Sequence, residues 1–143
     1  MNQIETFFDT MAERWDAVCV HDPGKIRTIL DRTNLRQNAR ILDVGCGTGI
    51  LESYLLPYEP RQIVAIDIAG QMIEKARMKY PDHPLIEFLG ESGDAAKDAL
   101  LGRARALLFP IDWPEPFGLV MIEALACGTP VIAVHAPPFT ETV

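Results

Sequence analysis

The feature that most constrains the fold is a regular alternation of short apolar runs and helical patterns from residue 40 onward. The apolar runs have the length of strands and lie at Arg40–Val44, 63–66, 85–89, 106–109 and 131–134. The helical patterns between them lie at 49–56, 70–80, 94–104 and 117–127. Apolar strands that alternate with helices indicate a parallel sheet covered on both faces. Right-handed crossovers then predict a doubly wound, Rossmann-like α/β fold with five parallel strands in the order 3-2-1-4-5.

Two amphipathic helices are predicted before the first strand. Residues 3–17 place apolar side chains at helical spacing from Ile4 to Trp15. The second pattern, Pro23–Arg32, begins with a proline, which suits a first helical position. With 143 residues, the chain has the length of one domain.

Charge and cysteine content restrict the partners and the compartment. The chain has 13 basic and 20 acidic residues, a net charge of −7, and so lacks the basic surface that displaces counterions from phosphates. We therefore expect no nucleic-acid partner. Cys19, Cys46 and Cys127 form no CxxC pair, which predicts the reduced thiols of a cytoplasmic protein and neither a disulfide framework nor a zinc site. Isolated histidines predict no metal site, and no apolar run predicts a membrane span or a signal peptide.

A glycine-rich turn follows the first predicted strand. Residues 43–49 read DVGCGTG, and such glycines let a ligand approach the backbone. The free amides at the start of the next helix favour an anion. Asp67 ends the second strand, where a carboxylate can accept hydrogen bonds from both ribose hydroxyls of an adenosine ligand. We expect the ligand at the carboxyl ends of the strands, at the switch point between strands 1 and 4.

The spacing of the glycines bears on which adenosine ligand fits. These residues alone do not separate NAD from S-adenosylmethionine. The turn has the spacing G-x-G-x-G and not the dinucleotide spacing G-x-G-x-x-G. A dinucleotide needs amides for its pyrophosphate, whereas S-adenosylmethionine presents one carboxylate and a cationic sulfonium. A plain tight turn, or a site for another nucleotide, remains the alternative.

The first half of the chain resembles class I S-adenosylmethionine-dependent methyltransferases. The resemblance covers about residues 4–90. It rests on ILDVGCGTG at 41–49, similar to motif I of that family, and on VAIDI at 64–68, similar to its second strand. Residues 7–16 resemble the N-terminal helix that lids the cofactor. The resemblance implies a small-molecule ligand, S-adenosylmethionine or S-adenosylhomocysteine.

The same resemblance implies a role for each matched residue. Asp43 orients the turn and the ligand's amine, Asp67 holds the ribose, and Ile68 packs on the adenine. The residues that line the methionine moiety are Gly45, Gly47 and Gly49. Asp9 and Asp16, in the first helix, are interpreted as solvated charges rather than catalysts.

The later part of the chain, about residues 86–133, is similar to a different family. Residues 108–133 read LFPIDWPEPFGLVMIEALACGTPVIA, which resembles the C-terminal nucleotide-sugar domain of retaining GT-B glycosyltransferases of group 1. Glu115 and Glu123 reproduce that family's E-x7-E pair. The resemblance implies that the first contacts the sugar of a nucleotide-sugar donor and the second its ribose. In this chain we favour the alternative, in which Glu115 is a charged loop residue and Glu123 is a solvated helix residue.

The reason is that other parts of a glycosyltransferase are missing. No matching Arg/Lys pair for the diphosphate lies upstream, and the acceptor domain is absent. A nucleotide diphosphate would face four carboxylates, those of Asp43, Asp67, Asp112 and Glu115. Repulsion between like charges at low dielectric then costs more than the remaining contacts recover. Asp112 and Glu115 are nonetheless the catalytic candidates, as an adventitious base beside the same crevice.

We therefore expect one domain, 1–143, that joins a methyltransferase-like half (1–90) to a glycosyltransferase-like half (91–143), as a recombinant or engineered chimera. The expected function is binding of S-adenosylmethionine or S-adenosylhomocysteine with little or no turnover. The alternatives are an active small-molecule methyltransferase, a scaffold without ligand, and a residual nucleotide-sugar-binding fragment. No helix or strand is predicted after the fifth strand, and an exposed sheet edge there predicts self-association.

Overall fold

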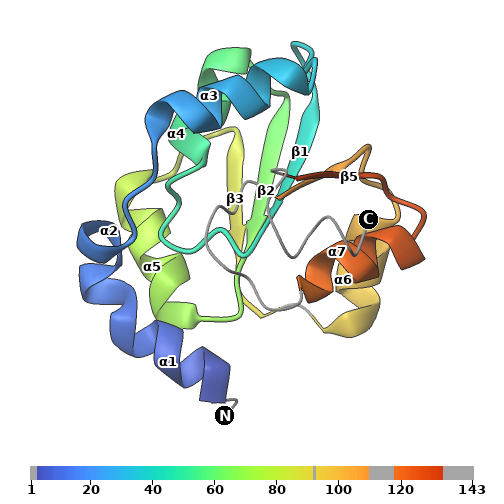
Figure 1. Ribbon diagram of the computed structural model, residues 1–143. Helices are drawn as coiled ribbons and strands as arrows, with labels where there is room; N and C mark the ends of the chain where they lie inside the picture. The colour runs from blue at the N-terminus through green and yellow to red at the C-terminus, as the bar shows by residue number, and fades with distance from the viewer. Residues whose placement is uncertain (1–2, 92, 110–117, 134–143) are drawn as a thin grey trace. The chain divides into compact units, whose positions relative to one another are not determined.

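A computed structural model describes residues 3–91, 93–109 and 118–133 of the chain (Figure 1). The chain divides into two compact units, Met1–Ser92 and Gly93–Val143, which are described here one at a time. Each unit contains parallel strands connected by helices. The predicted α/β class with parallel strands is therefore confirmed.

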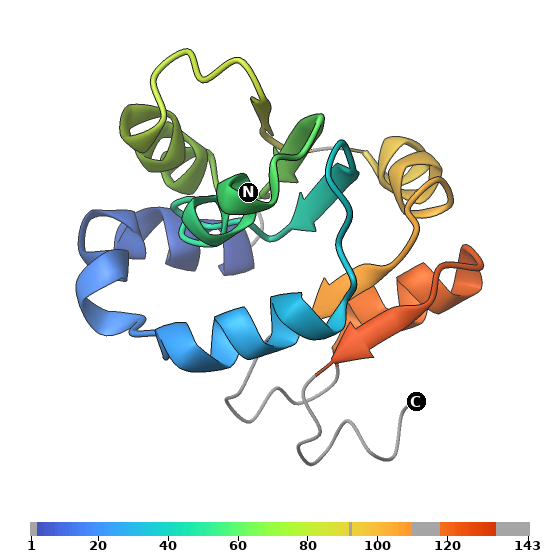
Figure 2. The same cartoon turned by 90° about the horizontal axis from the view of Figure 1, so that it is seen from above.

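The first unit opens with short helices. The helix predicted over 3–17 is divided into three pieces: α1 (Gln3–Met11), a 3-10 turn (Ala12–Arg14) and α2 (Trp15–Val18). Side chains three residues apart lie above one another in 3-10 geometry. The turn therefore brings Ala12 and Trp15 together onto a cluster with Ala69 and Met72. Figure 2 shows α1, in dark blue, below the yellow-green helix α5 on which it packs.

The second predicted helix has the expected bounds. Helix α3 spans Pro23–Arg32, with the proline in its first turn. The Asp22 carboxylate accepts hydrogen bonds from the backbone N–H groups of Gly24 (2.8 Å) and Lys25 (3.3 Å). These bonds satisfy two amides that have no partner within the helix, which fixes where the helix begins.

Three strands form the sheet of the first unit: β1 (Arg40–Val44), β2 (Gln62–Ile66) and β3 (Ile86–Leu89). They are parallel, in the order β1-β2-β3. The central strand β2 is the most buried, with Ile63 and Ala65 fully inaccessible. Because the strands are parallel and in register, β1 and β2 end at the same edge of the sheet, with Val44 paired to Ile66.

The remaining helices of this unit are α4 (Glu52–Leu55), which continues as a 3-10 turn (Leu56–Tyr58), and α5 (Gly70–Lys79). Helix α4 begins three residues later than the predicted start at residue 49, because residues 47–51 form turns. Helix α5 packs on the sheet through a core cluster made of Cys46, Ala65, Ile73, Ala76 and Phe88.

The second unit contains α6 (Asp94–Leu101), β4 (Leu107–Phe109), α7 (Leu119–Ala126) and β5 (Val131–Ala133). The two strands are parallel, with Leu108 paired to Ile132. Helix α7 ends at Ala126, and Gly128, two residues later, has a φ of +79°, the left-handed conformation typical of the position after a helix C-terminus. The Thr129 hydroxyl then donates a hydrogen bond to the Leu101 carbonyl, which connects the segment after α7 to the end of α6.

The predicted single sheet in the order 3-2-1-4-5 is not what the structure contains. The strands form one three-stranded sheet and one two-stranded sheet, so only the partial order 3-2-1 and the pairing of strands 4 and 5 are confirmed. Strands β4 and β5 have three residues each and can form only a short ladder. Strand β1 is exposed or half-buried along its length, as an edge strand is. No helix in the described part of the chain is both long and apolar enough to cross a membrane.

Candidate functional site

The glycine turn is fixed to the carboxyl end of the central strand. Gly45, Gly47 and Gly49 have φ values of +76°, +54° and +76°, in the left-handed region that other residues rarely adopt. The N–H groups of Gly45 and Cys46 both donate to the Ile66 carbonyl, at 2.8 and 3.1 Å. Hydrogen bonds within the protein therefore hold the backbone of the turn against β2.

Asp67, the predicted ribose ligand, also holds this turn. Its Oδ2 accepts a 2.8 Å hydrogen bond from the Gly47 N–H, and its Oδ1 accepts one of 2.8 Å from the Ala69 N–H. Burial raises the pKa of Asp67, although these two amides act in the opposite direction. Each carboxylate oxygen has a second lone pair, so the group can still accept hydrogen bonds from a ribose.

Asp43, the predicted partner of the ligand's amine, lies beside a second carboxyl group that sequence reasoning missed. Glu52, the first residue of α4, is 0% exposed and its carboxyl group neighbours that of Asp43. Burial is the largest cause that raises the pKa of each, and the charge of the other carboxylate further raises the pKa of Glu52. A charged residue within the mostly apolar run ILESYLL was the signal in the sequence.

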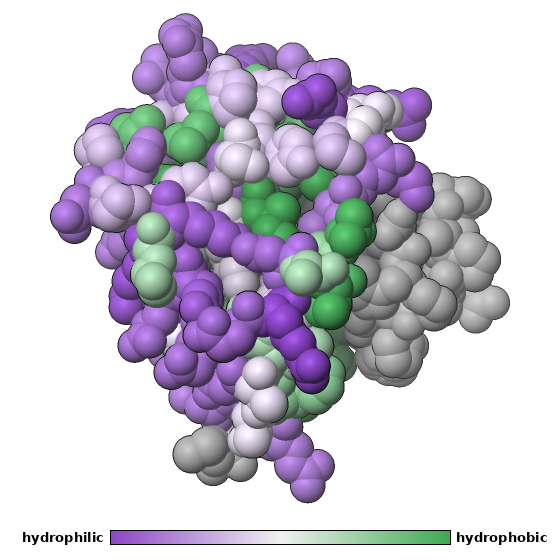
Figure 3. All heavy atoms as spheres, turned by 90° about the vertical axis from the view of Figure 1, so that its left-hand side faces the viewer, coloured by the Kyte–Doolittle hydropathy of each residue, from purple (hydrophilic) through white to green (hydrophobic). Residues whose placement is uncertain are grey.

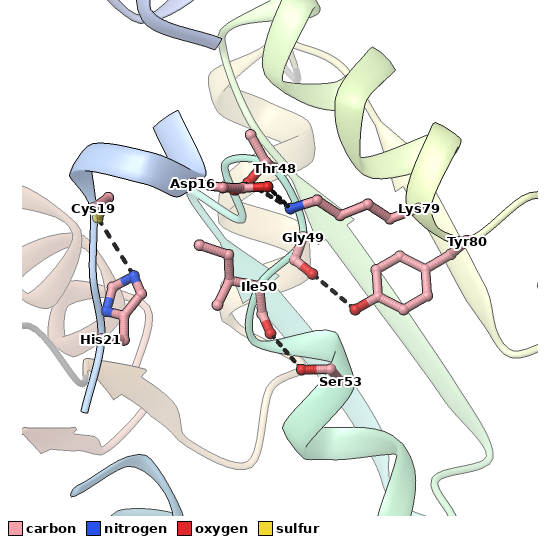
Figure 4. A network of polar contacts seen from close by, with 9 residues as sticks. All are labelled: Asp16, Cys19, His21, Thr48, Gly49, Ile50, Ser53, Lys79 and Tyr80. Carbon is pink, nitrogen blue, oxygen red and sulfur yellow. Dashed lines mark hydrogen bonds and ion pairs between the residues drawn. The ribbon is translucent and has the colours of Figure 1, made fainter. Parts of the chain in front are cut away.

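The N-terminal helices cover the turn. The Trp15 indole lies against Gly47, since a Cβ at that glycine would be 3.4 Å from Trp15 Nε1. The Asp16 carboxylate accepts a hydrogen bond from the Thr48 hydroxyl and forms a 2.6 Å ion pair with Lys79 (Figure 4). Lys79 Nζ also donates to Thr48 Oγ1 at 3.0 Å. Burial acts to raise the pKa of Asp16, but the bonds to Lys79 and Thr48 lower it overall.

Asp9 and Asp16 are therefore more than the solvated charges that the sequence suggested. Asp9 Oδ1 accepts a 2.8 Å hydrogen bond from the Gln71 N–H and so caps the first turn of α5 from α1. Helix α5 has no side-chain cap of its own. Figure 3 shows the face that carries α2 and α5, where hydrophobic atoms appear between mostly hydrophilic side chains.

Two hydrogen bonds support the turn from the other side. The Tyr80 hydroxyl donates to the Gly49 carbonyl at 2.9 Å, and the Ser53 hydroxyl donates to the Ile50 carbonyl at 2.9 Å (Figure 4). A Cβ at Gly49 would lie 3.1 Å from the Ala76 Cβ, so the turn also packs closely on α5. Side chains from α2, α4 and α5 thus converge on residues 45–51.

The other predicted residues have different outcomes. Ile68, the predicted adenine contact, is half-buried directly after Asp67. Glu123 would contact a nucleotide ribose according to the glycosyltransferase resemblance, but we expected it to be a solvated helix residue. It forms a 2.7 Å ion pair with Lys97 of α6. The catalytic candidates Asp112 and Glu115 lie outside the described residues. Among the described residues, no group of three His, Cys, Asp or Glu side chains could hold a metal ion.

Cys46 lies in the turn but has no nucleophilic character. Its side chain is buried, and burial followed by the charges of Asp43, Glu52 and Asp67 raises the pKa of the thiol far above its ordinary value. A thiol with so high a pKa remains protonated and unreactive.

Both resemblances drawn from the sequence are confirmed by family comparisons. Residues 14–91 match the ribosomal RNA adenine dimethylase family, and residues 59–143 match the group 1 glycosyl transferases. Each match covers more than half of the chain, and the two overlap at residues 59–91.

Curated relatives fall into the same two classes. A malonyl-[acyl-carrier protein] O-methyltransferase from Acetivibrio thermocellus is 41% identical over 80 residues, which cover 54% of this chain and 28% of the relative. A phosphatidyl-myo-inositol mannosyltransferase from Propionibacterium freudenreichii is 30% identical over 98 residues, which cover 59% of this chain and 25% of the relative. The chain thus spans only about a quarter of the length of these relatives.

Several solved structures similar to this chain are methyltransferases. A SAM-dependent methyltransferase from Geobacter sulfurreducens, in complex with S-adenosyl-L-homocysteine, superimposes with a TM-score of 0.60 at 19% identity, over 89% of this chain and 54% of that one. The 23S rRNA methyltransferase ErmE gives 0.52 at 24% identity, over 75% and 40%. These likenesses establish a Rossmann-like α/β fold. The chain therefore belongs to the ribosomal RNA adenine dimethylase family over residues 14–91 and to the group 1 glycosyl transferases over residues 59–143.

Proposed function

We propose that the chain binds S-adenosylmethionine or S-adenosylhomocysteine at the glycine turn. The observation that carries this proposal is the Asp67 carboxylate, which lies at the end of β2 and is hydrogen-bonded to the Gly47 amide. One group thereby positions the turn and remains able to accept ribose hydroxyls. In this assignment Gly45, Gly47 and Gly49 line the methionine moiety, and Ile68 packs on the adenine.

The charge of the site favours a cationic ligand over a diphosphate. Asp43, Glu52 and Asp67 gather around the turn, and Lys79 is engaged by Asp16. A sulfonium and an ammonium gain from carboxylates at low dielectric, whereas a pyrophosphate is repelled by them. This electrostatic argument supports S-adenosylmethionine over NAD or a nucleotide sugar.

We further propose that methyl transfer is slow or absent in this chain. Transfer needs an acceptor held in line with the sulfonium, which is largely a matter of positioning. The segment expected to supply the acceptor contacts, with Asp112 and Glu115, has a glycosyltransferase-like sequence. A recombinant origin accounts for this combination. An active methyltransferase is the second candidate, supported by the 41% identity to an O-methyltransferase.

Three other functions have less support: nucleotide-sugar binding, RNA binding and self-association. Glu123 is engaged by Lys97, which argues against a nucleotide-sugar site that depends on this glutamate. The net charge of −7 argues against an RNA partner, although one matched family methylates ribosomal RNA adenine. Strand β5, hydrogen-bonded to β4 among the described strands, remains a candidate edge for self-association.

Isothermal titration calorimetry with S-adenosylhomocysteine, NADH and UDP tests the proposal. We expect saturable binding of S-adenosylhomocysteine and none of the two diphosphates. Binding of NADH or UDP in its place would overturn the assignment. No detectable binding of any of the three ligands would favour a scaffold without a ligand function. A radiolabelled methyl-transfer assay over a panel of small acceptors separates binding from turnover.

A further inference from the structure

The buried carboxyl pair of Asp43 and Glu52 is not explained by the fold. Glu52 is 0% exposed although α4 is a short helix beside the turn. Asp43 Oδ2 and both carboxyl oxygens of Glu52 are shielded from solvent, and none has a hydrogen-bond partner at ordinary distance and angle within the described part of the chain. The backbone N–H of Glu52 lowers the pKa of its own carboxyl group without meeting those limits. Buried carboxyl oxygens without partners are costly to keep and therefore point to a specific role.

The polar groups that face this pair have other partners. Lys79, from α5, lowers the pKa of Glu52 but its ammonium is bonded to Asp16 and Thr48. The Tyr80 hydroxyl, at the end of α5, donates to the Gly49 carbonyl. The remaining neighbours add no positive charge. They are the Cys46 thiol in the turn, which contacts the Gly47 carbonyl, and the Asp67 carboxylate after β2.

Two adjacent carboxyl groups in this setting cannot both be ionised without strong repulsion. Ionised carboxylates only accept hydrogen bonds, so the charged pair has no bond between its members. One proton makes Glu52 a donor to Asp43 and removes one of the two charges. The buried, unpartnered oxygens become a hydrogen-bonded pair with a single negative charge.

We propose that Asp43 and Glu52 share one proton, and that Glu52 is a positioning residue through which the site selects adenosine ligands that carry an ammonium group. This inference rests on the proposed function and names the part of the ligand that is selected. An ammonium beside Asp43 stabilises the ionised pair, so the bound proton passes to the buffer as the ligand enters. The site then gains a charge that matches the ligand, and no bond other than O–H is broken.

Proton release on binding follows directly. S-adenosylhomocysteine carries the ammonium, whereas 5′-methylthioadenosine has the same nucleoside thioether without the amino-acid part. From mildly acidic to neutral pH, affinity for the first ligand should rise, by up to about tenfold per pH unit where a full proton is released. Affinity for the second should stay level.

Calorimetry in two buffers of different ionisation enthalpy measures this release. We expect wild-type protein to release protons with S-adenosylhomocysteine but not with 5′-methylthioadenosine. Glu52→Gln keeps a donor for Asp43 but cannot release its proton, so it should bind both ligands with nearly level pH profiles. Glu74→Gln, which alters an exposed glutamate of α5, is the matched control and should behave as wild type. Equal pH profiles for the two ligands in wild-type protein would overturn the inference while leaving the binding function intact.

A measurement on the free protein keeps the two claims separate. The carboxyl carbon of Glu52, followed by NMR during a pH titration, should change well above pH 4.5, the ordinary pKa of a glutamate. A change centred on that ordinary value would overturn the shared proton. Failure of both adenosine ligands to bind would instead refute the proposed function, and with it the selective role of the pair.

Discussion

At the residue scale, two glycines of the turn are required for different reasons, one for its backbone conformation and the other also for close packing. Gly45 and Gly49 have the same φ of +76°, so a side chain at either position strains the backbone. A Cβ at Gly45 would meet nothing within 4 Å, whereas one at Gly49 would lie 3.1 Å from the Ala76 Cβ and 3.2 Å from Tyr80 Cε2. The pair therefore separates backbone strain from steric overpacking against α5.

Alanine substitutions at these two glycines should differ in their effect on stability. Gly45→Ala should lower the free energy of unfolding by about 1–2 kcal/mol through left-handed strain alone. Gly49→Ala should lose about 1–3 kcal/mol more, because overpacking against α5 adds to the strain. Urea denaturation measures both, and equal losses would show that the close approach to α5 is not rigid.

Asp67 carries two roles that one substitution should reveal together. Asp67→Ala removes the acceptor of the Gly47 and Ala69 amides, so the free energy of unfolding should fall by about 1–3 kcal/mol. Binding of S-adenosylhomocysteine should weaken by about the same amount. Asp98→Ala, at an exposed position of α6, is the control. Unchanged affinity in a folded Asp67→Ala protein would contradict the ribose assignment.

Glu52 should also make stability depend on pH. Burial first, and the Asp43 charge second, raise the pKa of Glu52 in the folded protein above its ordinary value of 4.5. Above pH 4.5 the folded state then binds more protons than the unfolded state, so this glutamate's contribution to stability declines as pH rises toward its folded pKa. Thermal denaturation at a series of pH values should show a shallower decline for Glu52→Gln. An identical slope in both proteins would refute the raised pKa.

At the element scale, local sequence patterns predicted most helices and strands but not how they are joined. Strand β1 and helix α3 have the predicted bounds, since an apolar run and a proline with a preceding capping aspartate are local signals. The 3-10 turn between α1 and α2 was missed because it depends on packing against Met72, far away in the sequence. The division into two sheets was missed for the same reason, since strand pairing is not encoded in periodicity.

The attachment of the N-terminal helices to α5 can be tested through Asp16. Asp16→Asn removes the charge that pairs with Lys79, so α2 should detach more often from α5 and the glycine turn. Amide hydrogen exchange in α1 and α2 should become faster, while exchange in β2 stays slow. Glu13→Gln is the matched control, because the Glu13 carboxylate is 79% exposed in its pair with Lys75 and contributes little. Equal exchange rates in the two variants would contradict a closing role for Asp16.

At the scale of the whole molecule, the sequence predicted family and ligand class better than the details of the site. The two family matches overlap at residues 59–91, which include β2, α5 and β3, elements common to many doubly wound folds. Motif residues such as Gly47 and Asp67 were visible because their spacing is typical of a ligand-binding turn. Glu52, Thr48 and Lys79 were not, because their importance comes from burial and contacts that only the folded chain creates.

The central claim is that the turn after β1 binds an adenosine ligand of the S-adenosylmethionine type. The most direct measurement is a titration of ¹⁵N-labelled protein with S-adenosylhomocysteine, followed through backbone amide shifts. We predict saturable shifts concentrated at residues 45–49 and 67–69, with Ala133 and the rest of β5 unaffected. Shifts absent from the turn, or spread evenly over the protein without saturation, would contradict the account.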